Sequence, residues 1–228
     1  MAKQTYLELT NRILGRINQS EIADVTTATG HSLIITDLIN EAQNELFTDA
    51  NWYSLYTSRS FNTVADTATS AVAADFGRGI SLQDTTNNRL LIEDVFKAFD
   101  EQDPNADMTG PPTHYAYQNG YYRFYPVPAG VYAMTDRYWK QPTALSANAS
   151  TSDLPVECEN AIIHYAWYKI LQYLNKFEQA DRIRIEYEKT LTKAIKMNDK
   201  MLDKMHVMQR SSFYQGIEPP RWPSGYGM

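Results

Sequence analysis

The stretch that decides the fold is YAYQNGYYRFY, residues 115–125. Aromatic side chains recur on both sides of its central pair, Asn119 and Gly120. An Asn-Gly pair readily takes the positive φ angles that a type I′ turn needs at both central positions. The stretch therefore predicts a β-hairpin, and residues 131–139 predict a further strand of the same sheet.

The segments around the hairpin extend the β region toward the N-terminus. Residues 55–61, LYTSRSF, alternate and are β-branched or aromatic, so they predict a strand. Residues 65–75 are small and weakly patterned and predict a loop with an edge strand. Residues 89–99 fit a helix or a strand, of which a strand is favoured, and the acidic, proline-containing residues 100–112 predict a loop. The glycines of Phe76-Gly77-Arg78-Gly79 predict a turn rather than a phosphate-binding loop.

Helices precede this β region. Thr5 followed by Glu8 forms a capping-box pattern, in which each side chain accepts a hydrogen bond from the other residue's backbone amide. Apolar residues then recur every four positions, which predicts a helix over residues 5–18. A second apolar stripe predicts a helix over residues 31–48.

Helices also follow the β region. An acidic residue and a proline in Asp153-Leu154-Pro155 are typical of a helix start. Apolar spacing then predicts one helix over residues 155–174 and a longer one over residues 178–208. The last twenty residues contain prolines and late glycines, so they cannot continue a helix, and their weak apolar pattern predicts an extended arm.

These elements predict an α+β fold, in which a helical bundle built from the N- and C-terminal thirds carries an inserted small antiparallel β domain. The expected parts are the first part of the helical domain (residues 1–53), the β insert (54–151), the second part of the helical domain (152–208) and an extended C-terminal arm (209–228).

Composition narrows the class of protein. The chain has 228 residues, with 27 acidic against 21 basic side chains and a net charge of −6. Nucleic-acid binding without sequence preference relies on Lys and Arg, so this balance argues against a dedicated DNA-binding protein. The single cysteine, Cys158, excludes an internal disulfide framework and suits a reducing compartment. No apolar run approaches the length of a membrane span, and the N-terminus does not resemble a signal peptide.

No pattern of catalytic, metal-binding or cofactor-binding residues is found. The four histidines are not spaced as metal ligands, and no phosphate-binding glycine motif occurs. Cys158 and His164 are six positions apart on one helix, so they point to different faces and do not form a nucleophile–base pair. The acidic loop lacks the central glycine of a calcium loop and offers no distinctive glycosidase acid pair; its carboxylates are Asp100, Glu101, Asp103 and Asp107.

A row of lysines is the first candidate site. The residues recur at helical spacing on the last helix: Lys189, Lys193, Lys196, Lys200 and Lys204. One interpretation is a solvated face. A second is a subunit interface that docks on an acidic surface, such as residues 1–50 or 93–107 of a neighbouring copy. Phosphate contact is a third interpretation.

The C-terminal arm is the second candidate site. Aromatic and apolar residues stand among prolines there: Phe213, Tyr214, Ile217, Pro219, Pro220 and Trp222. Apolar side chains on an extended arm are buried when the arm docks in the groove of a partner or a neighbouring subunit. The alternative is a disordered end.

Short spaced motifs over about 210 residues carry a family resemblance: residues 5–9 and 12–14, residues 38–46 (LINEAQNEL), Trp52, Ala74-Asp75-Phe76, Asp153-Leu154-Pro155 and residues 161–166. Together they resemble the head-to-tail adaptor, or head-completion, proteins of tailed bacteriophages. Similar proteins often have Leu-Pro ahead of the Asp-Phe step, where this chain has Val72-Ala73-Ala74.

The resemblance implies a structural virion protein without catalysis or cofactor. Such adaptors form a homo-oligomeric ring, commonly a dodecamer, that joins the portal protein to the tail or nozzle protein at the head–tail junction. The ring continues the channel through which DNA passes during ejection, without specific binding. The helical domains build the ring, and the C-terminal segment holds the portal or a neighbouring subunit. Assembly would take place in the host cytoplasm, without a membrane partner.

Two other functions are compatible with the sequence. One is a peptidoglycan-degrading enzyme of the virion. The other is a soluble helical binding or regulatory protein.

Overall fold

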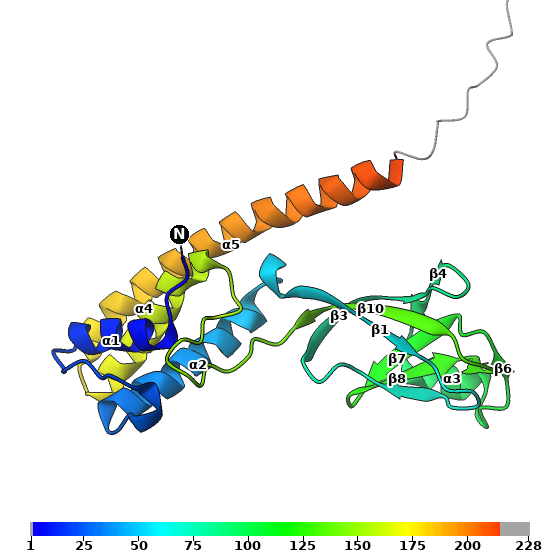
Figure 1. Cartoon of the computed structure of the whole chain (residues 1–228), viewed down its shortest axis with the longest axis horizontal. Helices are drawn as coiled ribbons and strands as arrows, with labels where there is room; N and C mark the ends of the chain where they lie inside the picture. The colour runs from blue at the N-terminus through cyan, green and yellow to red at the C-terminus, as the bar shows by residue number, and fades with distance from the viewer. Residues whose placement is uncertain (1, 215–228) are drawn as a thin grey trace, which may run out of the picture. The chain divides into compact units, whose positions relative to one another are not determined.

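The computed structural model describes residues 2–214, and residues 205–214 by their backbone alone (Figure 1). The chain divides into two compact units. The first combines the N-terminal residues through Ala42 with the chain from Pro155 onward, and the second is Gln43–Leu154. The first unit is helical and the second is rich in β-strands, so the α+β class with terminal helices and a central sheet region is confirmed.

The helical unit contains four α-helices and two short 3₁₀ helices. They are α1 (Tyr6–Arg16), η1 (Val25–Thr27), α2 (His31–Asp49), η3 (Val156–Cys158), α4 (Glu159–Tyr173) and α5 (Phe177–Tyr214). Helix α2 continues past Ala42 into the second unit. No helix of the described chain is both long enough and apolar enough to span a bilayer.

The predicted capping box begins α1. The Glu8 amide donates to Thr5 Oγ1 (3.3 Å), and the Thr5 amide donates to Glu8 Oε2 (2.7 Å). Two of the amides that a helix start leaves without partners are thus satisfied. The apolar face of α1 is fully buried at Leu9 and Ile13.

Hydrogen bonds connect helices that are distant in sequence. The Tyr6 hydroxyl on α1 donates to the Thr36 carbonyl on α2 (2.9 Å). The Tyr165 hydroxyl on α4 donates to Glu41 Oε1 (2.7 Å), which Lys169 also approaches to 3.4 Å. These contacts fix the first two helices to the helix that follows the β unit.

Helix α5 is much longer than its neighbours. Its 38 residues correspond to about 57 Å, against about 22 Å for the 15 residues of α4. Its buried side chains lie between Ala180 and Asn198. The helix ends at Tyr214, six residues beyond the expected end, so Phe213 and Tyr214 belong to its last turn instead of an extended arm.

The second unit contains ten strands and one short helix: β1 (Tyr56–Asn62), β2 (Thr69–Ala71), β3 (Phe76–Asp84), β4 (Arg89–Leu90), β5 (Ile92–Glu93), α3 (Phe96–Gln102), β6 (Thr109–Gly110), β7 (His114–Gln118), β8 (Tyr121–Tyr125), β9 (Val127–Pro128) and β10 (Ala133–Lys140), with the 3₁₀ helix η2 (Tyr53–Leu55) ahead of them. Two four-stranded sheets form, in the orders β1-β10-β3-β4 and β2-β8-β7-β5. Pairing is antiparallel except in the short pairs β5–β7 and β6–β9.

The predicted hairpin is confirmed as β7 and β8. Its turn residues, Asn119 and Gly120, have φ angles of 52° and 82°. Gln118 pairs with Tyr121 across the turn. The hairpin therefore has the two-residue loop with two positive φ angles that its sequence predicts.

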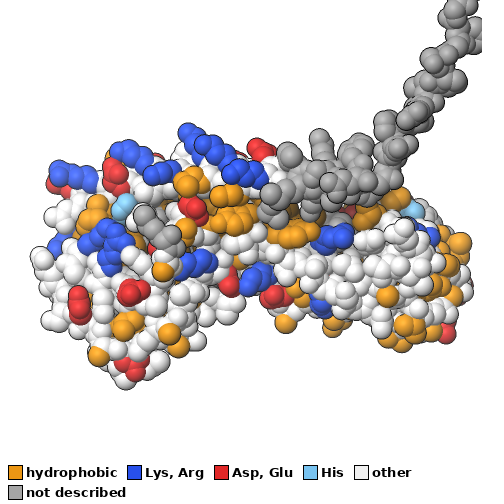
Figure 2. Space-filling model, turned by 45° about the horizontal axis from the view of Figure 1, so that its top comes forward, with side chains coloured by type: hydrophobic (Ala, Val, Ile, Leu, Met, Phe, Trp, Pro, Cys, Tyr) orange, Lys and Arg blue, Asp and Glu red, His pale blue; other side chains and the backbone are white. Residues whose placement is uncertain are grey.

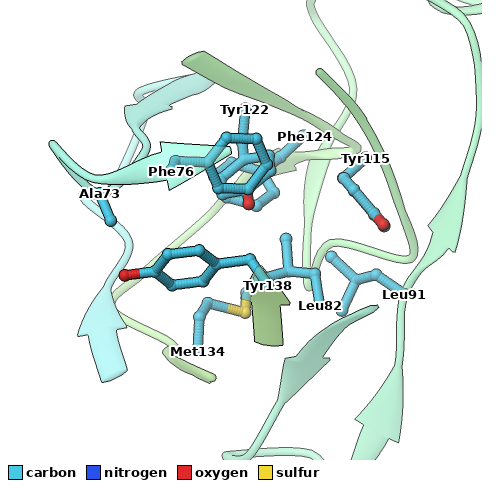
Figure 3. Packing of buried hydrophobic residues seen from close by; sticks show 9 residues of the cluster. All are labelled: Ala73, Phe76, Leu82, Leu91, Tyr115, Tyr122, Phe124, Met134 and Tyr138. Carbon is cyan, nitrogen blue, oxygen red and sulfur yellow. The ribbon is translucent and has the colours of Figure 1, made fainter. Parts of the chain in front are cut away.

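The two sheets share one aromatic core (Figure 3). One sheet contributes Phe76, Leu82, Met134 and Tyr138, and the other contributes Tyr115, Tyr122 and Phe124. Aromatic rings meet edge to face, as in the pair of Phe76 and Tyr122, whose centroids are 6.0 Å apart. This core makes the β unit a packed structure in its own right.

The prediction of a turn at residues 76–79 is wrong, because these residues form the start of strand β3. Gly77, one of the glycines that suggested a turn, instead lies in close contact with neighbouring residues. A Cβ atom at Gly77 would collide with the ring of Phe47 and the carbonyl oxygen of Trp139. Gly77 thus allows a helix and a strand to approach within the β unit.

The strand favoured over residues 89–99 is only partly present. Residues 89–93 form β4 and β5, but Phe96–Gln102 form α3, which also takes the start of the expected acidic loop. Phe99 on α3 is buried and stacks on Tyr125 at 5.5 Å. The apolar residues of this segment are therefore spaced for a short helix.

A buried carboxylate lies at the edge of the aromatic core. Asp136 on β10 is 1% exposed, accepts a 2.8 Å hydrogen bond from the Tyr122 hydroxyl, and pairs across the strands with Arg59. Burial raises the pKa of Asp136, while the Tyr122 hydrogen bond and the charge of Arg59 lower it. The two sheets are thus joined by a polar contact inside an apolar core.

Replacing Tyr122 by phenylalanine leaves this carboxylate without its donor. A buried acceptor that loses its partner costs about 1–3 kcal/mol, so we expect Tyr122→Phe to lower the free energy of unfolding by that amount. Urea denaturation followed by tyrosine fluorescence measures it. The control is Tyr117→Phe on the same sheet, where the side chain is 46% exposed; an equal loss there would contradict the assignment.

Candidate interaction sites

The predicted lysine row lies on one side of α5. All five side chains, from Lys189 to Lys204, are exposed. At 100° per residue they fall within an arc of about 80°, centred about 140° from the buried residues of the same helix. Figure 2 shows Lys and Arg side chains recurring along α5. We call these five residues the lysine face.

Most of the lysine face has no ionic partner. Lys189 Nζ lies 2.7 Å from Glu186 Oε1, and this contact lowers the pKa of the Glu186 carboxyl. The other four lysines have no carboxylate within 4 Å among the described residues. The face is therefore available to an acidic surface.

Exposed apolar side chains border the lysine face on both sides. By helical position, Ile185 lies beside one edge, and Met197 and Met201 lie beside the other. Ile185 is 52% exposed, and each methionine is 38% exposed. The lysine face and its borders thus form a surface of mixed charged and apolar character.

The aromatic arm lies mainly outside the described residues. Ile217, Pro219, Pro220 and Trp222 are beyond Tyr214, and the side chains of Phe213 and Tyr214 are not described. Their proposed docking role stays a prediction.

The residues considered for catalysis have structural roles. Cys158 is completely buried, and this burial raises the pKa of its thiol. His164 Nδ1 lies 3.4 Å from Thr190 Oγ1, on the contact between α4 and α5. The sulfur and the imidazole therefore serve the helical core.

The acidic loop uses its carboxylates within the β unit. Asp100 pairs with Arg123 at 2.6 Å. Asp103 is buried and accepts hydrogen bonds from the amides of Asp107 and Met108. No group of three metal-ligating side chains occurs among residues 2–204.

A pocket that the sequence analysis missed lies where α1 ends and α5 begins. Its volume is about 280 Å³. Three cationic residues line it (Arg16, Lys176 and Arg182), together with apolar walls from Trp167, Leu171 and Ile183, and no carboxylate lines it. We call it the Arg16 pocket. Its residues come from three separate segments, so no local pattern could have revealed it.

Two donors in the Arg16 pocket lack acceptors. Arg16 Nη1 and Trp167 Nε1 are both shielded from solvent and have no hydrogen-bond partner in the described structure. The guanidinium lies over the indole ring, 4.5 Å from its centroid. Burial, and then the charge of Arg12, lowers the pKa of Arg16. Each unpaired buried donor costs about 1–3 kcal/mol, so the pocket favours an anionic acceptor.

The charge of Arg16 also acts on His164. Burial is the main cause that lowers the pKa of His164; the charges of Arg16 and Arg12 lower it further, and Glu186 raises it. A histidine whose pKa is lower in the folded state loses folding stability as the pH falls from about 6.5. The charge of Arg16 thus acts at His164, where a titration can detect it.

We expect Arg16→Gln to raise the pKa of His164 toward its ordinary value, because a nearby like charge is removed. NMR titration of the histidine ring protons measures this shift. The acid-side loss of stability should shrink in parallel. Arg184→Gln is the control, since Arg184 is not among the charges that act on His164. A pKa that stays constant in Arg16→Gln would show that the charge of Arg16 does not act at His164.

Comparison with known proteins identifies a family. The profile described as SU10 adaptor protein matches residues 4–212. No curated protein matches the chain. The family match confirms the resemblance to phage head-to-tail adaptor proteins.

Proposed function

Since the chain belongs to the SU10 adaptor protein family, we propose that it forms an oligomeric ring of twelve copies that joins the portal protein to the tail or nozzle protein. The ring continues the DNA channel at the head–tail junction of the virion and performs no catalysis. Assembly takes place in the host cytoplasm.

Helix α5 carries this proposal. Among its side chains described through Lys204, the buried ones lie between Ala180 and Asn198, and the helix continues to Tyr214. Along this length the lysine face and its apolar borders have few partners in the helical unit. A helix that exposes both charged and apolar side chains beyond the part packed in its own core is suited to packing against another chain.

Charge complementarity indicates which surface the lysine face meets. Residues 1–50 contain seven acidic against three basic side chains, whereas residues 169–210 contain ten basic against six acidic ones. One chain thus has an acidic end and a basic end, so neighbouring copies attract each other when unlike ends meet.

The net charge of −6 suits a channel for DNA, because like charges repel and weaken adhesion to the wall. This argument requires the lysine face to lie at subunit contacts. A lumen lined by these lysines would contradict it.

The first test is the mass of the purified chain by light scattering, alone and mixed with the portal ring of the same virus. We expect a complex of ring size with the portal. A chain that stays monomeric and ignores the portal would contradict the adaptor ring.

The lysine face is tested in the same assay. We expect the variant that combines Lys193→Glu, Lys196→Glu and Lys200→Glu to need about tenfold more protein for assembly, because attraction becomes repulsion. The matched control replaces the same three lysines by arginine and keeps the charge, so it should assemble normally. Equal assembly of both variants would assign the lysines to a solvated face.

Removal of residues 210–228 tests the arm. Among the α5 side chains described through Lys204, the last buried one is Asn198, so we expect the midpoint of thermal unfolding to stay within about 2 °C of the intact chain. Light scattering with the portal should show weaker assembly. Unfolding of the truncated chain would instead mean that these residues belong to the folded core.

A further inference from the structure

The Arg16 pocket needs a ligand with two chemical features. Its three cations and its two unpaired nitrogens require a negatively charged acceptor. Arg16 itself has no ion pair in the described chain. The first turn of α5 borders the pocket and adds the positive end of the helix dipole. The walls from Leu171 and Ile183 require an apolar group beside the anion.

One segment of the chain presents both features. Residues 92–95, Ile-Glu-Asp-Val, combine two acids with two apolar side chains, and Ile92 and Val95 are 60% and 64% exposed. Their backbone is fixed, because the Ile92 amide donates to the Thr113 carbonyl (3.0 Å) and the Asp94 amide to the Tyr115 carbonyl (2.8 Å). A segment held in one conformation loses little entropy when it binds.

The acidic part of α2 fits the pocket less well. It offers one exposed apolar side chain, Leu33, near the exposed Asp37. The residues of this helix that precede Asp37 have no second exposed large apolar group. The 92–95 segment therefore matches the pocket better in both charge and apolar content.

We propose that the Arg16 pocket binds the 92–95 segment of a second copy of this chain, with the Glu93 carboxylate near Arg16 and Arg182 and an apolar side chain against Leu171. The proposal rests on the ring proposed above and names one of its subunit contacts.

Such a contact is of the kind that a ring requires, because it joins two different surfaces of the chain. The pocket and the segment are different surfaces of one chain, so each copy can bind one neighbour through its pocket and another through its segment. A contact of this heterologous kind repeats from copy to copy and closes when the rotation between copies divides a full turn.

A charge exchange tests the contact in the full chain mixed with the portal ring. We expect Arg182→Glu and Glu93→Lys each to raise the protein concentration for half-assembly about tenfold, because like charges then meet. The chain that carries both changes restores opposite charges between positions 93 and 182, while Arg16 and Lys176 keep their charge, so it should assemble better than either single variant. Light scattering measures the mass of the assembled complex, and thermal unfolding verifies that each variant is folded.

Two charge-matched controls are available. Arg184→Glu changes the same charge on the same helix but lies outside the pocket. Asp37→Lys changes an exposed acid of the competing surface. Arg184→Glu should assemble as the unchanged chain does. Asp37→Lys lies at the acidic end proposed to meet the lysine face, so it should weaken assembly less than Glu93→Lys does. Loss of assembly in Asp37→Lys but not in Glu93→Lys would overturn the choice of segment.

The remaining outcomes separate this contact from the proposed function. If the unchanged chain assembles and the double variant stays as weak as the single ones, the contact is wrong and the ring stands. If Arg182→Glu abolishes binding of a 20-base-pair DNA duplex and leaves assembly unchanged, the pocket holds phosphate and the proposal is overturned. If the unchanged chain fails to assemble with the portal, the ring and this contact both fail.

Discussion

The packing of α1 and α2 against α4 is the constraint on which the rest of the chain depends. Short amphipathic helices are marginal in isolation and gain their stability from a partner, and here the partners are separated by 112 residues (43–154). Closing so long a segment costs only slightly more entropy than closing a shorter one. A segment of this length still needs a core of its own to fold, and the aromatic cluster between the two sheets supplies it.

Sequence reasoning succeeded where a short stretch determines its own conformation. The capping box of Thr5 and Glu8 and the turn of Asn119 and Gly120 are such stretches, since each depends on residues at most three positions apart. It failed where distant residues decide. Gly77 suggested a turn, but its role is set by Phe47, thirty positions away in the sequence. The lysine face could be predicted because its residues recur at helical spacing. The Arg16 pocket could not, because Arg16, Trp167 and Arg182 are far apart in the sequence and share no regular spacing.

Buried charged groups in this chain differ in whether their own chain supplies a hydrogen-bond partner. In the β unit, Asp136 and Asp103 are buried and receive hydrogen bonds from their own chain. In the helical unit, the half-buried Arg16 has no such partner. A buried charged group that is hydrogen-bonded within its own chain stabilises one conformation. A buried charged group that lacks such a partner favours association with a molecule that supplies one.

The length of α5 has a mechanical consequence. A continuous α-helix curves only gently over tens of ångströms unless a proline or a bulge interrupts it, and no proline occurs between Phe177 and Tyr214. A push or a tilt applied to its far end is therefore delivered to the turn at Phe177, about 57 Å away, with little loss. A contact made at the far end of α5 can therefore change the position of the helix start that packs in the helical unit.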